Sequence, residues 1–238
     1  MILVLSLFPG IGLLDRAFEE EGFCVVRGPD KLWGGDIKRF SVPSGRFDGV
    51  IGGPPCKAFS RGAARARKGA QRLADDLIPE FVRVVEEASP DWYLAENVPE
   101  SPVVEVPGYR SASVVVCNRN FGGIQRRRRR FTFGSLGRIL PVKVVDALLS
   151  ERREPPAELI PTVTSNATLW DPIKKRSYSE RSPRYLEVAK RAQGLPADFE
   201  LPGHTVAGAI AAIAQGVPLP MGRAVARAVR RSLGGDSA

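Results

Sequence analysis

The sequence predicts an α/β protein in which helices cover a parallel sheet, and two observations carry this prediction. Short apolar runs alternate with amphipathic stretches through the N-terminal half, as they do in consecutive βαβ units. Turns rich in glycine and proline, at residues 8–12 and 52–55, follow two of the apolar runs. With 238 residues, of which 43% are hydrophobic, the chain is long enough for one globular domain with a small appendage.

Each expected element follows from its own pattern. Apolar runs predict strands at residues 2–7, 23–26, 47–51, 92–95, 113–117 and 130–133. Apolar residues at helical spacing predict helices at residues 13–21, 77–88, 185–193, 205–214 and 221–233. The part from 135 to 182 is the least regular, because it is rich in proline and has a basic stretch at 174–176. We interpret it as a small insertion or lobe.

Composition and charge exclude several classes of protein. The chain has 35 Lys and Arg against 26 Asp and Glu, and this net charge of +9 favours a polyanionic partner such as nucleic acid. It has no run of eighteen apolar residues and no basic leader, so we expect neither a membrane span nor a signal peptide. Its three cysteines lack CxxC spacing and predict a reducing cytoplasm. With His204 as the one histidine, a histidine metal site and a histidine triad both lack members.

A glycine-containing turn, Phe8-Pro9-Gly10-Ile11-Gly12, follows the first expected strand and opens a helix. Glycines at this point of a doubly wound sheet let the backbone approach a cofactor, although an ordinary tight turn explains them equally well. Asp36 follows the second strand region, where acidic residues bind the ribose and adenine of nucleoside cofactors. The alternative for Asp36 is a solvated loop carboxylate.

Cys56 follows the strand at 47–51 through a Gly-Gly-Pro-Pro turn. Since this turn fixes the backbone, the cysteine is placed as a nucleophile rather than packed as a core residue. Positive potential from nearby Lys57, Arg61 and Arg65 would raise its thiolate fraction. The alternative is a buried structural cysteine.

Glu96 ends the strand at 92–95, so it and Cys56 are expected at the same carboxyl edge of the sheet. A thiolate and a carboxyl group together suit addition to an electron-poor ring. The thiolate adds to the ring while the carboxyl group binds or protonates a ring nitrogen. Taken alone, Glu96 could equally cap a helix or form an ion pair.

Five consecutive arginines at 126–130 follow Gln125 and precede an apolar stretch. In a strand, Arg127 and Arg129 share one face and the even-numbered arginines share the other. One set could line a pocket while the other contacts phosphates. The alternative is a solvated basic patch.

Taken in order, Phe8-x-Gly10-x-Gly12, Gly53-Pro54-Pro55-Cys56, Glu96-Asn97-Val98 and Gln125-x-Arg127-x-Arg129 resemble the motifs of DNA cytosine-5 methyltransferases. Residues 192–199 and 213–218 are similar to the late and closing segments of that family. The resemblance spans residues 1 to about 233 and implies a small phage- or bacterial-type enzyme. Its fold would be the Rossmann-like sheet of class I S-adenosylmethionine-dependent methyltransferases with a small target-recognition lobe.

The resemblance also implies the reaction. Cys56 would add covalently to C6 of a cytosine that is flipped out of double-stranded DNA, and C5 would then take the methyl group of S-adenosylmethionine. Glu96 would contact N3 and the exocyclic amine. Arg127 and Arg129 would support the addition and hold the base carbonyl.

Further assignments follow from the same resemblance. The cofactor-binding residues would be Phe8, Gly10, Gly12, Asp30, Asp36 and Pro54. The DNA-binding residues would be Lys57, Arg61, Arg126, Arg128, Lys174 and Lys175. The implied organisation is a catalytic domain at 1–134, a target-recognition region at 135–183 and C-terminal helices at 184–238 that return to the catalytic domain. We expect a monomer without a metal or membrane, in the cytoplasm of a bacterial host cell.

The chain departs from the family pattern mainly around the cofactor. Ser6 stands where an aspartate is usual, Leu13 replaces the third glycine, and Ala214-Gln215 replaces a Gly-Asn pair. Two alternatives follow: a DNA-binding protein on the same fold without useful catalysis, and a methyltransferase for RNA or modified cytosine. Because few base-reading side chains fit into a short recognition region, we also predict a short or relaxed target sequence.

Overall fold

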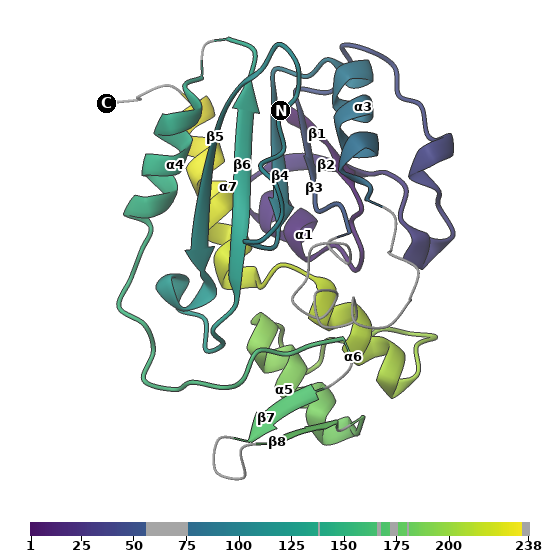
Figure 1. The fold of residues 1–238 in the computed structure, drawn as a ribbon, viewed down its shortest axis with the longest axis vertical. Coiled ribbons are helices and arrows are strands. Elements are labelled where there is room, and N and C mark those ends of the chain that lie inside the picture. Colours follow the sequence, from purple (N-terminus) through teal and green to yellow (C-terminus); the bar gives the residue numbers. More distant parts are fainter. Residues whose placement is uncertain (56–75, 138, 166–167, 172–175, 180, 235–238) are drawn as a thin grey trace.

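A six-stranded sheet forms the centre of the protein, which Figure 1 shows as a computed structural model. The structure describes residues 1–238 except 56–75, 138, 166–167, 172–175, 180 and 235–238. The strand order is β2-β1-β3-β4-β6-β5. The strands are β1 (Ile2–Leu7), β2 (Phe23–Arg27), β3 (Gly49–Gly52), β4 (Trp92–Asn97), β5 (Arg110–Cys117) and β6 (Arg128–Ser135). The predicted α/β fold and all six predicted strands are confirmed.

Strand direction differs from the prediction at one end of the sheet. β1, β2, β3 and β4 run parallel, whereas β6 runs antiparallel to both of its neighbours, β4 and β5. Residues 118–127 bring the chain from β5 into β6 as a hairpin-like connection, which contains the short helix η4 (Asn118–Phe121). Such a short connection joins antiparallel strands, since a parallel pair needs a longer crossover.

Helices cover both faces of the sheet (Figure 1). α1 (Leu13–Glu20), α4 (Pro141–Ser150) and α7 (Leu219–Leu233) contribute to one core cluster, and α3 (Ile78–Ala88) contributes to the other. Side chains of β4 alternate between the two clusters, with Trp92 and Leu94 in the first and Tyr93 and Ala95 in the second. The sheet is therefore buried on both sides, as expected for a doubly wound fold.

The parallel strands end together at one edge of the sheet. Leu7 of β1 pairs with Gly52 of β3, and Gly52 pairs with Ala95 of β4. The turns after β1, β3 and β4 are consequently neighbours in space. All three of the motifs that the sequence placed after these strands meet at this edge.

A small lobe lies beyond that edge, in the lower part of Figure 1. It consists of residues 160–163, β7 (Thr168–Asp171), β8 (Arg176–Ser179), α5 (Pro183–Gln193) and α6 (Val206–Gln215). Its own core contains Val163, Tyr185, Ala189, Ile210 and Ile213. The antiparallel pairing of β7 with β8 makes a hairpin within the expected recognition region.

The segments that pack together do not coincide with the three regions, 1–134, 135–183 and 184–238, that the sequence predicts. α4 falls inside the expected recognition region, yet Val144 and Leu148 are buried in the core formed by α7 and the sheet. α5 and α6 fall inside the expected C-terminal segment, but they share the core of the small lobe with Val163. The proline-rich composition hid the apolar face of α4, which is set by its packing against α7.

Residues 206–233, which include α6 and α7, are long and apolar enough to cross a membrane. However, 72% of the most apolar window is buried inside the fold. Such burial is typical of a core helix, so this segment is weak evidence for a membrane span.

Candidate active site

The turn after β1 has an unusual backbone. Phe8, Gly10 and Gly12 have φ values of 56°, 55° and 74°, all in the left-handed region. A Cβ atom on Gly10 would meet no atom within 4 Å, so the backbone there is open to an approaching ligand. The turn is thus open at Gly10, whereas at Gly12 a Cβ would lie 2.8 Å from the Arg27 guanidinium.

Asp30 and Trp33 hold this turn from the segment after β2. Asp30 Oδ2 accepts a hydrogen bond from Gly10 N at 2.8 Å, and the Trp33 indole N–H donates to Gly10 O at 2.6 Å. The structure therefore brings Phe8, Gly10, Gly12 and Asp30 together, as the cofactor assignment expects. Trp33 was missed because its side chain is 60% exposed, and only the fold shows that it contacts the turn.

Asp36 takes a different place from the other cofactor candidates. It caps the short helix η2 (Ile37–Arg39), with its Oδ1 accepting a hydrogen bond from Lys38 N at 3.1 Å. This geometry agrees with the alternative of a solvated loop carboxylate. Its cofactor role stays a prediction.

A carboxyl group lies beside Ser6, where the family motif usually begins with aspartate. Ser6 Oγ donates to Asp15 Oδ1 at 2.5 Å, and Arg27 Nε donates to Asp15 Oδ2 at 3.0 Å. Burial raises the pKa of Asp15, although Ser6 and Arg27 oppose this effect. The sequence departure at position 6 is thus accompanied by a carboxyl group supplied from α1.

Glu96 and Arg129 form an ion pair at the carboxyl ends of β3 and β4. Arg129 Nε lies 2.7 Å from Glu96 Oε1, and their side chains are only 15% and 12% exposed. Burial raises the pKa of Glu96, while the charges of Arg129 and Arg127 act in the opposite direction. A carboxyl group with a raised pKa keeps its proton to a higher pH than an ordinary glutamic acid, which suits protonation of a ring nitrogen.

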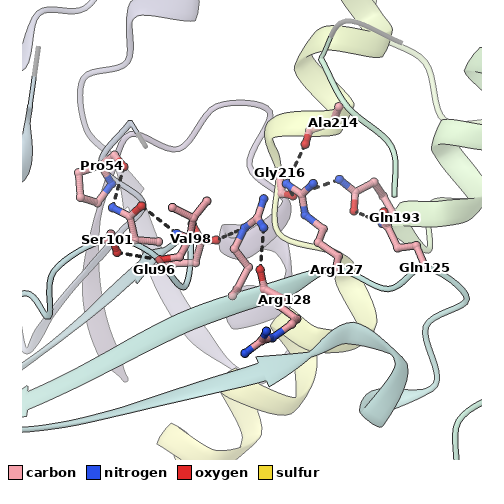
Figure 2. A network of polar contacts seen from close by, with 12 residues as sticks. Pro54, Glu96, Val98, Ser101, Gln125, Arg127, Arg128, Gln193, Ala214 and Gly216 are labelled. Atoms are coloured by element: carbon pink, nitrogen blue, oxygen red, sulfur yellow. Dashed lines mark hydrogen bonds and ion pairs between the residues drawn. The ribbon is translucent and has the colours of Figure 1, made fainter. Parts of the chain in front are cut away.

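Asn97 connects this carboxyl group to the turn that leads to Cys56. Its Nδ2 donates to Pro54 O at 3.2 Å, and its Oδ1 accepts from Val98 N at 2.8 Å. Pro54 is buried and lies beside Glu96 and Val98 (Figure 2). Asn97 is a positioning residue that sequence reasoning did not single out, although it lies inside the Glu96-Asn97-Val98 motif.

Several predicted site residues fall on parts of the chain outside the described residues. These residues are Cys56, Lys57, Arg61, Lys174 and Lys175. The described chain reaches Pro55, directly beside the Glu96 segment. The roles of these five side chains stay predictions.

Strand alternation predicts the surroundings of the arginines at 126–130 only in part. Arg126 and Arg128 are exposed, which agrees with contact to phosphates. Arg130 is half-buried and donates to Pro99 O at 2.8 Å, so it supports the loop after Glu96. Arg129 reaches Glu96, whereas the Arg127 guanidinium donates to the carbonyls of Ala214 and Gly216.

Gly53 gives a direct test of the Glu96 geometry. A Cβ at this position would lie 2.9 Å from Glu96 Oε2, so G53A should displace the carboxyl group rather than the backbone. If the chain catalyses the reaction that its motifs imply, kcat should fall by about tenfold, because small displacements of a reacting group are costly. Urea unfolding should show a midpoint close to that of the wild type.

Gly137 provides the matched control, because a Cβ there would meet no atom within 4 Å. G137A should retain the wild-type kcat. Equal rates for G53A and wild type would show that the Glu96 carboxyl position does not limit the reaction.

Among the residues that the structure describes, no group of three or more His, Cys, Asp or Glu side chains could hold a metal ion. The described site consists of the glycine turn, the Glu96–Arg129 pair and the turn before Cys56.

Solved structures place this fold in a class. The chain is similar to the Dnmt2 methyltransferase of S. pombe, with a TM-score of 0.65, 14% sequence identity and coverage of 100% of both chains. The fold is that of class I S-adenosylmethionine-dependent methyltransferases, as predicted.

Sequence comparisons show similarity to one family of methyltransferases. Residues 30–101 match the model of the C-5 cytosine-specific DNA methylases. The chain is 28% identical over 146 residues to the type II methyltransferase M.NgoPII of Neisseria gonorrhoeae, covering 54% of this chain and 38% of that protein. It is 33% identical over 111 residues to M.FnuDI of Fusobacterium nucleatum, covering 40% of this chain and 32% of that protein.

The chain thus spans about a third of the length of either bacterial relative. The resemblance to DNA cytosine-5 methyltransferases that the motifs predict is nevertheless confirmed.

Proposed function

We propose that the protein transfers a methyl group from S-adenosylmethionine to C5 of cytosine in double-stranded DNA. The single observation that carries this proposal is the buried Glu96–Arg129 pair, which lies beside the turn leading to Cys56. The family match over residues 30–101 covers both this turn and Glu96. The geometry thus unites the motifs that the family resemblance assigns to one reaction.

The protein's own residues divide the work as follows. The Cys56 thiolate forms a bond to C6 of the extruded cytosine, and electron density moves toward N3. Glu96 hydrogen bonds or protonates N3 as charge develops, and Arg129 orients the Glu96 carboxyl group and faces the base carbonyl. After C5 has gained the methyl group, loss of its proton and of the Cys56 sulfur restores the aromatic ring and the free thiolate.

S-adenosylmethionine supplies an electrophilic methyl group when it is bound. The open turn formed by Phe8, Gly10 and Gly12 would hold its nucleoside part, with Asp30 fixing the turn through Gly10 N. Pro54 borders the same edge. Two further proposals, a cofactor contact by Asp36 and monomeric action in the cytoplasm of a bacterial cell, follow from the family resemblance.

Arg126 and Arg128 are proposed to contact DNA phosphates, because both are exposed at the start of β6 next to Arg129. R126Q and R128Q should each weaken DNA binding and reduce the slope of log K against log salt by about 0.9. Fluorescence anisotropy over a salt series measures this slope.

Arg110 is the matched control for these substitutions. It is also exposed, but it pairs with Ser135 at the opposite end of β6. R110Q should keep the wild-type slope. An unchanged slope for R126Q and R128Q would remove both residues from the DNA interface.

The proposed function is tested by incubating the purified protein with S-adenosylmethionine and unmethylated duplex DNA, followed by mass spectrometry of the nucleosides. We expect 5-methyldeoxycytidine. DNA binding without any methylated nucleoside would favour a binding protein on this fold, and methylation of RNA alone would change the substrate class.

A further inference from the structure

Three buried side chains form a polar hub where the small lobe meets the sheet: Gln125, Arg127 and Gln193 (Figure 2). Their exposed fractions are 0%, 4% and 0%. Gln125 and Arg127 precede β6, while Gln193 is the last residue of α5. A polar group buried this deeply is costly unless it is hydrogen bonded, so the contacts of this polar hub are informative.

The polar hub satisfies carbonyl groups at the end of α5. Gln125 Nε2 donates to Ala192 O at 2.7 Å and to Gln193 Oε1 at 2.9 Å. The last four carbonyls of a helix have no partner within the helix. Gln125 therefore caps α5 from a segment almost seventy residues earlier in the chain.

The polar hub also closes the end of α6. Gln193 Nε2 donates to Ile213 O at 2.6 Å, and Arg127 Nη2 donates to Ala214 O at 2.8 Å. Both side chains also donate to Gly216 O, at 3.1 and 3.2 Å respectively. A cation at the carboxyl end of a helix is additionally favoured by the helix dipole. The two helices of the lobe thus end on one set of side chains.

Segment 160–163 of the lobe is hydrogen bonded to residues 124–126. Ile160 N donates to Ile124 O at 2.9 Å, and Thr162 Oγ1 donates to Arg126 O at 2.7 Å. Val163 N donates to Gln125 Oε1 at 3.2 Å. Segment 160–163, the end of α5 and the end of α6 are consequently all hydrogen bonded to residues 124–127 or to Gln193.

The same stretch leads directly to the catalytic edge. Arg129 follows Arg127 by two residues, a separation of about 7 Å in an extended chain, and its guanidinium pairs with Glu96 at 2.7 Å. The lobe and the Glu96–Arg129 pair are therefore fixed to one short, extended segment.

We propose that Gln125, Arg127 and Gln193 are positioning residues. They fix the position of the small lobe relative to the catalytic edge, and thereby determine which DNA sequences are methylated. This inference rests on the proposed function. It gives Arg127 a different role from the base contact that the sequence predicts, because its guanidinium is already directed at the end of α6.

Two substitutions test the proposal. R127K keeps the positive charge near Glu96 but loses the planar guanidinium, whose Nη2 donates to Ala214 O and Gly216 O and whose Nη1 donates to Val163 O. Q193E replaces an amide donor with a carboxylate that faces the carbonyls of Ile213 and Gly216. The control is R110K, which makes the same chemical change as R127K at an exposed arginine at the opposite end of the β5–β6 pair.

The readouts are kcat, KM for DNA and the distribution of methylated cytosines on a plasmid. For R127K and Q193E we expect KM to rise by about tenfold, as for loss of one or two buried hydrogen bonds, with methylation spreading to sites that differ from the wild-type target. Their kcat at saturating DNA should stay within about threefold of wild type, and R110K should match wild type throughout. A fall in kcat with unchanged KM and unchanged sites would overturn the proposal and make Arg127 a catalytic residue.

Amide hydrogen exchange tests the proposal independently of activity. R127K and Q193E should exchange faster at 160–163 and 213–216 than wild type, while β4 keeps its protection. Unchanged exchange at both segments would overturn the positioning role. If wild type transfers no methyl group, the proposed function fails, but the exchange result still decides whether the polar hub fixes the lobe.

Discussion

Replacing Cys56 with serine should abolish methyl transfer, with a loss in kcat of at least about 10³-fold. A serine hydroxyl is a far weaker nucleophile than a thiolate, because it stays protonated at neutral pH. A hydroxyl nucleophile would need a strong base beside it, and the one histidine of the chain, His204, makes an edge-to-face contact with Trp33 instead. DNA affinity should remain within about threefold of wild type, since the hydroxyl group is no larger than the thiol.

Cys117 offers a matched control for this experiment. It is half-buried at the end of β5, where it pairs with Arg128, so C117S makes the same chemical change outside the proposed reaction. The measurement is 5-methyldeoxycytidine formed per enzyme, together with DNA binding by anisotropy. Substantial transfer by C56S, or equal losses in C56S and C117S, would contradict the assignment of Cys56 as the nucleophile.

Local sequence patterns predicted the elements of the sheet well because each strand is a short apolar run. Alternation along β4 even separates Trp92 from Tyr93, which face opposite cores. The direction of β6 was not predicted, since it depends on the length of the connection from β5 rather than on composition. α4 was missed because the segment around it is rich in proline. The apolar side of this helix, Val144 and Leu148, can be recognised only from its packing against α7.

The candidate site was predictable where partners lie at the ends of neighbouring strands. Glu96 and Arg129 meet because β4 and β6 pair in the sheet. The sequence placed Glu96 at this edge, and the family resemblance assigned Arg129 to the same reaction. Contacts across long stretches of chain were beyond the sequence. Arg127 bonds to Ala214, 87 positions later, and no periodicity links the two residues. The hydrogen bond from Ser6 to Asp15 likewise becomes visible only in the fold, where α1 lies beside β1.

The carboxyl group of Glu96 should be needed in the transition state more than in binding. E96Q keeps the size of the side chain but cannot donate a proton from a carboxyl group, so we expect kcat to fall by about 10²-fold. DNA affinity should change by less than about threefold, because the interaction with N3 strengthens only as the ring gains charge. Single-turnover rates and equilibrium binding separate the two effects.

The direction of the pKa shift of Glu96 predicts how kcat/KM depends on pH. Burial raises the pKa of Glu96, so its protonated form persists to a higher pH than in an ordinary glutamic acid. If the protonated form supplies the proton to N3, wild-type kcat/KM should fall as the pH rises through this raised pKa. E96Q cannot titrate, and its profile should lack this alkaline decline.

Glu86 provides the control, because it is exposed on α3 and away from the sheet edge. E86Q should reproduce both the wild-type rate and the wild-type pH profile. A normal rate for E96Q would remove Glu96 from the reaction. A slow E96Q that keeps the alkaline decline would instead assign that decline to another group, with Glu96 acting through its hydrogen bond alone.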